Sequence, residues 1–156
     1  NGCPSSSWMD FYKEIKGAKE VEIPSGGTAI VTVAQVAEAL IGAMEYGTHG
    51  TTYLICDTNM KFTEATRIVL DELGQSYTRI NLLKEEEYIA QMVQIDERYA
   101  AQGKEAGILM KTMASILSRE MYADPETAMS VLKYKKVDIE EWLRQMTHDC
   151  VANDKL

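Results

Sequence analysis

The stretch TAIVTVAQVAEALIGAMEYGTHGTTYLI, residues 28–55, most constrains the fold because its hydrophobic pattern changes twice. Residues 28–33 are rich in β-branched side chains and predict a strand. Apolar residues then recur at helical spacing, and Thr32 and Gln35 have the spacing of a capping box, so we expect a helix that ends near Tyr46. A glycine-rich turn follows, and residues 51–56 predict another strand. The predicted order is strand, helix, turn, strand.

Other short patterns extend this unit in both directions. A helix is predicted over residues 8–16, and Val21 and Ile23 alternate with glutamates as in a half-exposed strand. Thr63 is expected to cap a helix that ends at Gly74. Residues 77–82 alternate again and predict a strand.

Helical patterns dominate the rest of the chain. Tyr88, Met92, Ile95 and Tyr99 form a helical stripe, and Gly103 is expected to end that helix. Further helices are predicted near residues 109–117, after Asp124-Pro125, and from Asp138 onward.

The sequence therefore predicts an α/β to α+β fold, with short strands within residues 19–33, 51–56 and 77–82. Residues 1–83 form the predicted α/β segment, and residues 84–156 form a mainly helical C-terminal segment. Because no repeat or clear linker separates them, we expect one compact unit of 156 residues.

Composition excludes several classes of protein. The net charge of −8 disfavours nucleic acid as a partner, and no apolar run reaches the length of a membrane span. The three cysteines are widely spaced without a C-x-x-C pair, so neither a zinc site nor a disulfide framework is expected. Free thiols of this kind are typical of the reducing cytoplasm, which is the predicted location.

Three segments, in this order, resemble a known family. They are EVEIPSGGTAIVTVAQVAEALIGAME, TTYLICDTNMKFTEATRIVLDELGQ and TAMSVLKYKKVDIEEWLRQM. The chain resembles the C-terminal half of extended or atypical short-chain dehydrogenases/reductases, which include NAD-dependent epimerases/dehydratases and NmrA-like proteins. It departs from the family pattern at Gln35, where an Asp is usual, at Lys133, where a Gly is usual, and over residues 85–117, which match no family pattern.

The resemblance implies the substrate-side part of a Rossmann-type enzyme. Such enzymes bind NAD or NADP through a glycine-rich turn in an N-terminal half, and this chain contains no G-x-x-G-x-x-G. No cofactor is therefore expected in this chain alone, and no catalytic or metal-binding residue is assigned. We expect the chain to be the second half of a longer oxidoreductase or epimerase, inactive without the missing Rossmann half.

Six residues are candidate substrate contacts. The resemblance places Ser7 and Trp8 in a loop beside the substrate cleft, and Thr28, Thr32 and Gln35 where a strand faces that cleft. Tyr12 has Lys16 four residues on, as in the family's acid/base motif, but that motif belongs upstream of the segments matched here. We interpret the Tyr-Lys pair as a coincidence and keep Tyr12 only as a possible substrate contact.

Two other hypotheses stay open. The chain could be a non-enzymatic NmrA-like module that senses a ligand or binds a protein, or a novel helical domain with chance similarity, which predicts no strand over residues 28–33. For the enzyme hypothesis the expected partners are a small-molecule substrate, such as a nucleotide sugar, and the missing half. Strand edges left open should also favour a homodimer.

Overall fold

The structure is a computed structural model that describes residues 6–104 and 110–152, and it is mixed α/β with helices predominating. The helices of these residues are α1 (Ser6–Ile15), α2 (Val33–Tyr46), α3 (Phe62–Glu72), α4 (Glu85–Ala101), α5 (Met110–Leu117), α6 (Glu126–Leu132) and α7 (Ile139–Ala152). The strands are β1 (Glu20–Pro24), β2 (Gly27–Ile30), β3 (Thr58–Lys61), β4 (Arg79–Leu83) and β5 (Glu120–Met121).

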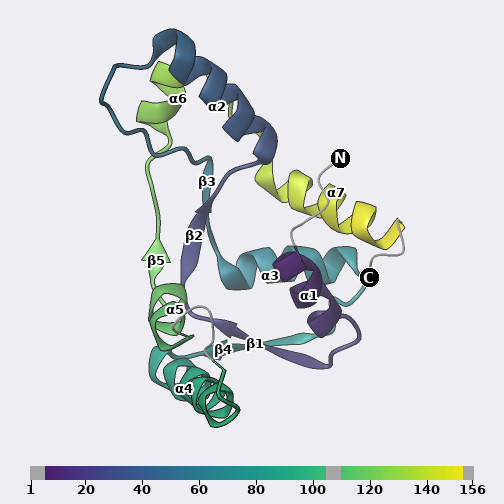
Figure 1. Cartoon of the computed structure of the whole chain (residues 1–156). Coiled ribbons are helices and arrows are strands. Elements are labelled where there is room, and N and C mark those ends of the chain that lie inside the picture. Colours follow the sequence, from purple (N-terminus) through teal and green to yellow (C-terminus); the bar gives the residue numbers. More distant parts are fainter. Residues whose placement is uncertain (1–5, 105–109, 153–156) are drawn as a thin grey trace.

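Two small sheets organise these elements (Figure 1). β1 and β4 pair in parallel, with Val21 opposite Ile80. In the other sheet β2 lies in the middle, antiparallel to β3 and parallel to β5. Both sheets are narrow, so among the described strands only β2 has a neighbour on each side.

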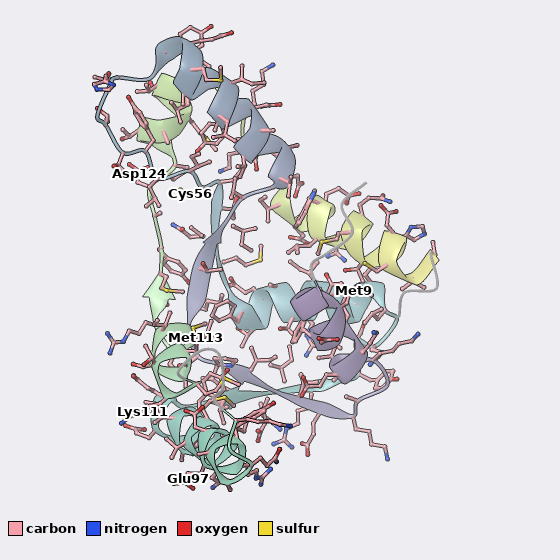
Figure 2. The ribbon with its side chains drawn as sticks, viewed as in Figure 1. Met9, Cys56, Glu97, Lys111, Met113 and Asp124 are labelled. Atoms are coloured by element: carbon pink, nitrogen blue, oxygen red, sulfur yellow. The ribbon has the colours of Figure 1, made fainter. Side chains whose placement is uncertain are left out.

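The main core lies between α3 and the β1–β4 sheet, with α1 and α7 completing it. α3 supplies the buried Ala65 and Val69, and α7 supplies Leu143 and Met146, at the three- and four-residue spacings that place side chains on one helix face. Met9 on α1, labelled in Figure 2, is among the partly buried side chains that pack against this core.

A second unit is built from α2 and α6, at the far end of the β2–β3–β5 sheet (Figure 1). Its small core contains Ala39, Ala128, Leu132 and Tyr134, with Tyr53 and Ile55 packed against it. Gly42 faces Leu132 so closely that a Cβ built there would lie 1.8 Å from the Leu132 carbonyl oxygen. The two helices therefore touch backbone to backbone at this glycine.

Helices α4 and α5 form a hairpin that packs mainly on itself. None of the α4 residues is fully buried, although α4 packs closely along α5. Gly103 follows α4 with a φ of 67°, a left-handed conformation that glycine adopts without strain. Contacts also cross the predicted boundary at residue 83, because α6 packs on α2, α7 packs on α3, and β5 pairs with β2.

Several predictions about local structure are confirmed. The capping box forms, with the Thr32 hydroxyl accepting from the Gln35 backbone N–H at 3.2 Å and the Gln35 side chain accepting from the Thr32 N–H at 3.0 Å. Strands occur within residues 19–33 and near residues 77–82. The hypothesis of a novel helical domain predicted no strand over residues 28–33, and β2 contradicts it.

The predicted strand over residues 51–56 is wrong. Residues 51–57 form no strand, and β3 begins only at Thr58. The Tyr134 hydroxyl donates to the Cys56 carbonyl at 2.8 Å and accepts from the Cys56 N–H at 3.3 Å, so a side chain satisfies backbone groups that a strand would pair. The apolar pattern arises because Tyr53 and Ile55 pack into the α2–α6 unit instead.

The predicted cap at Thr63 is also wrong by two residues. α3 begins at Phe62, and the residue before it, Lys61, donates its N–H to the Glu64 carboxylate at 2.9 Å. The acidic side chain thus satisfies a free amide at the helix start, which the Thr63 hydroxyl was expected to do.

Candidate functional site

An apolar pocket of about 400 Å³ lies between the main core and the α4–α5 hairpin. Its volume is in the range of small-molecule binding sites. Seven wall residues come from α1, β1 and α3, and Tyr88 and Leu117 come from the hairpin. The wall consists of Phe11, Ile23, Pro24, Phe62, Ala65, Thr66, Val69, Tyr88 and Leu117.

Among the described residues of this wall, the two hydroxyls of Thr66 and Tyr88 are the only polar side-chain groups. The Thr66 hydroxyl donates to the Phe62 carbonyl at 2.7 Å, which leaves its oxygen as an acceptor. Burial, and to a lesser extent the charge of Glu14, raise the pKa of Tyr88 above its ordinary value of 10.0, so its phenol stays protonated at neutral pH. The pocket thus offers a ligand mainly apolar contact.

An acidic groove of about 450 Å³ adjoins the apolar pocket, and the two share Phe11, Ile23, Pro24 and Tyr88. Glu14, Glu20 and Glu22 line it together with Gln91 of α4, and no Lys or Arg is among its lining residues. All four of these side chains belong to exposed residues, so the groove opens to solvent. The groove therefore borders the apolar pocket along the residues that the two share.

The glutamates of the groove bind neutral donors. The Glu22 carboxylate accepts from the Gln91 amide at 3.0 Å, and that of Glu20 accepts from the Asn81 amide at 3.1 Å. Among the described residues, none of the three glutamates forms an ion pair. The negative charge at the groove is therefore not neutralised by contact with a protein cation.

A broader hollow of about 670 Å³ lies on the other side of α3, where Ile80 and Leu82 of β4 form part of the wall. Its basic group is Arg67, whose guanidinium donates to the carbonyls of Ser76 at 3.1 Å and Thr78 at 2.9 Å. Arg67 thus closes the turn before β4, and the hollow offers a ligand fewer apolar walls than the pocket does.

Two of the predicted contact residues, Ser7 and Trp8, fall in α1 rather than in a loop. Their side chains lie outside what the structure describes. One turn further on, Phe11 lines the apolar pocket, so α1 does border the candidate site.

Tyr12 is completely buried against α7, where its hydroxyl is hydrogen-bonded to the Thr147 hydroxyl at 3.4 Å. Burial raises the pKa of Tyr12 above 10.0, opposite to the shift that acid/base chemistry requires. This position agrees with the interpretation of the Tyr-Lys spacing as a coincidence. A substrate contact at Tyr12 stays a prediction.

Thr28, Thr32 and Gln35 lie away from the two adjoining cavities. Thr28 is half-buried in β2, whereas Thr32 and Gln35 are buried at the start of α2. Beyond the capping box, the Gln35 amide donates to the Asp57 carboxylate and to the Lys135 carbonyl. Gln35 thus links the start of α2 to the segments that contain Asp57 and Lys135. A role of Thr28, Thr32 and Gln35 in substrate binding stays a prediction.

Asp57 is a buried carboxylate that the sequence analysis did not single out. Besides Gln35, the Val137 N–H donates to it at 2.9 Å and the Thr58 hydroxyl at 2.7 Å. Figure 2 labels its neighbour Cys56, where the chain passes from the α2–α6 unit into β3. Asp57 holds that junction together.

Phe11 and Leu117 lie within predicted helices, and Tyr88 was predicted as a member of a helical apolar stripe. Their sequence pattern is the same whether a stripe fills a core or lines a cavity, so no local signal distinguished the two. Within residues 6–104 and 110–152, no group of three or more His, Cys, Asp or Glu side chains could hold a metal ion. None of the helices in those ranges is long and apolar enough to cross a membrane.

Comparisons of the chain with protein-family models, curated proteins and solved structures find no match. Assignment to a family, and with it any activity, is therefore a matter for proposal.

Burial of Tyr12 predicts a loss of stability in alkali. The unfolded chain releases the Tyr12 proton near pH 10.0, whereas the folded chain retains it to higher pH. Above that pH the unfolded state binds fewer protons, so the free energy of unfolding falls as pH rises. The variant Tyr12→Phe should lose less stability than the wild type between pH 8 and pH 11, measured by urea unfolding. Equal losses would contradict this expectation, because the other tyrosines are common to both proteins.

Proposed function

We propose that this chain is the substrate-binding C-terminal part of an NAD(P)-dependent oxidoreductase or epimerase of the short-chain dehydrogenase/reductase type. The observation that carries the proposal is an uncovered apolar face on α2. Val33 is 81% exposed and Met44 is 88% exposed, and Leu40 and Ile41 between them are both more than half exposed. Contiguous apolar surfaces of this kind are rare on monomers and mark interaction sites.

The geometry of α2 makes this face distinct from the one that packs on α6. Gln35, Ala39 and Gly42 are buried toward α6, whereas Val33, Ala37, Leu40, Ile41 and Met44 fall on the other side at helical spacing. The charged residues of α2, Glu38 and Glu45, are confined to one border. A helix that is apolar on both sides is expected to be covered on both sides, and the proposed Rossmann half supplies the second cover.

Two further features support the same proposal. Both sheets end in strands with one neighbour, which leaves edges for pairing with an adjacent sheet. The first matched segment also contains a strand followed by a helix, β2 and α2, in the order on which the resemblance is based.

The described cavities do not suit a dinucleotide. A pyrophosphate binds best at a helix N-terminus approached through a glycine-rich turn, and the apolar pocket and acidic groove offer apolar walls and carboxylates instead. NAD or NADP would therefore be held by the other half, and this chain would contribute the substrate pocket.

The mass of the natural protein tests the proposal. An antibody raised against this chain, which has a mass of 17.5 kDa, should detect a natural polypeptide of roughly twice that mass, since domains of the proposed Rossmann half have ~150 residues. The chain alone should show no NAD(P)H-dependent turnover. A natural product of the size of this chain, or a cofactor-dependent rate from it, would refute the proposal.

A second function is a non-enzymatic module that senses a small molecule. The observation that favours it is that the described residues of this chain by themselves line the apolar pocket. A natural product of this size that binds a ligand without NAD(P)H would favour this function over the first.

A further inference from the structure

We propose that the apolar pocket binds a largely apolar small molecule without negative charge, which enters past the acidic groove. Whether that ligand serves as a substrate or as a signal rests on the proposed function, whereas its binding does not. The proposal is based on the walls of the two adjoining cavities and on how the α4–α5 hairpin is attached.

The walls determine the chemical class of the ligand. The aromatic rings of Phe11 and Phe62 and the aliphatic side chains of Ile23 and Val69 face the same space. A dry cavity of about 150 Å³ is already large enough to bind benzene, and this pocket measures about 400 Å³. A ligand with two aromatic rings or a short aliphatic body fits that size. The Tyr88 phenol can donate one hydrogen bond to it.

The groove determines which ligands are disfavoured. Glu14, Glu20 and Glu22 line the groove beside the pocket. Glu20 and Glu22 accept hydrogen bonds from neutral amides, and none of the three glutamates forms an ion pair among the described residues. A sulfonate, carboxylate or phosphate on the ligand would be repelled there. The pocket is thus a poor site for the diphosphate of a nucleotide sugar, which the family resemblance allows as a substrate.

The hairpin gives the pocket a wall that can adapt. Tyr88 and Leu117 reach the pocket from α4 and α5, which pack chiefly on each other and leave no α4 residue fully buried. The hairpin can therefore shift to admit a ligand without opening the main core. Segments with few buried contacts are the ones that move most easily.

A matched pair of fluorescent probes tests the ligand class. N-phenyl-1-naphthylamine is neutral, and 1-anilinonaphthalene-8-sulfonate has the same ring skeleton with one negative charge. The whole chain should bind one equivalent of the neutral probe and bind the sulfonate about tenfold more weakly. In the variant Glu14→Gln/Glu22→Gln, the sulfonate should gain affinity and the neutral probe should not. Equal affinities of the two probes for the wild type would overturn the proposal.

Filling the pocket tests the location. Ala65→Phe places a ring in the pocket and should weaken the neutral probe about tenfold or more, and Leu117→Trp does the same from the hairpin if the first variant fails to fold. Leu40→Ser/Met44→Ser, which disrupts the other apolar surface on α2, should change the affinity less than about twofold. The proposal would be overturned if the α2 variant lost binding of the neutral probe while the variants with a filled pocket kept it. It would also be overturned if the wild type did not bind the neutral probe. None of these readouts depends on a cofactor.

Discussion

Gly42→Ala is expected to destabilise the protein by about 2–3 kcal/mol, even though alanine favours helices by about 1 kcal/mol over glycine. The added Cβ would meet the Leu132 carbonyl oxygen at 1.8 Å and its carbonyl carbon at 2.6 Å. Both are backbone atoms, so no side chain can turn aside, and α2 must separate from α6. Urea unfolding followed by circular dichroism measures the change.

The matched control is Glu38→Ala on the same helix. Glu38 is exposed, so this change should alter the free energy of unfolding by less than about 0.5 kcal/mol. If Gly42→Ala proved as stable as the wild type or more so, the close contact between α2 and α6 would be wrong.

Asp57→Ala is expected to cost about 3 kcal/mol or more, the second large effect. The change removes a buried acceptor and leaves the Val137 N–H and the Thr58 hydroxyl without the partner they have in the wild type. The Gln35 Nε2 group keeps the Lys135 carbonyl as an acceptor but loses the Asp57 carboxylate. An unsatisfied buried donor costs about 1–3 kcal/mol, and hydrogen bonds to charged groups are the stronger ones.

Asp57→Asn separates the hydrogen bonds from the charge. One amide oxygen can still accept from Gln35 and Val137, while the Thr58 hydroxyl can rotate to accept from the new amide N–H. The loss of stability should therefore be about half that of Asp57→Ala. Glu97→Ala, an exposed change on α4, provides the neutral reference. A loss for Asp57→Ala no greater than that of Glu97→Ala would show that the buried network contributes nothing.

Elements that depend on neighbours in the sequence were predicted well. The start of α2 follows from Thr32 and Gln35, three residues apart, because a capping box needs no other part of the chain. Gly74 and Gly103 end their helices with φ values of 71° and 67°, as a glycine that follows a helix commonly does.

Elements that depend on distant partners were predicted poorly. Residues 51–56 have the composition of a strand, but Tyr134, 78 residues beyond Cys56, takes the hydrogen bonds of that backbone. The two-residue strand β5 exists only because Gly27 and Thr28 lie beside it. Neither outcome leaves a local pattern in the sequence.

The candidate site belongs to this second group. Phe11 and Tyr88 are 77 residues apart in the sequence. They line the same pocket only because the fold brings α4 close to α1 and β1. The same holds for the acidic groove, where Glu14 of α1 stands near two glutamates of β1. Thr28, Thr32 and Gln35, which the resemblance suggested, lie outside both cavities because they belong to β2 and the start of α2.

The sequence by itself determined the mixed α/β class, most helix positions and the acidic surface, because spacing and charge act over a few residues. Only the tertiary structure decided which apolar stripe fills a core, which encloses a pocket and which is left bare on α2. All three kinds of stripe have the same periodicity, and they differ only in what the rest of the chain brings against them.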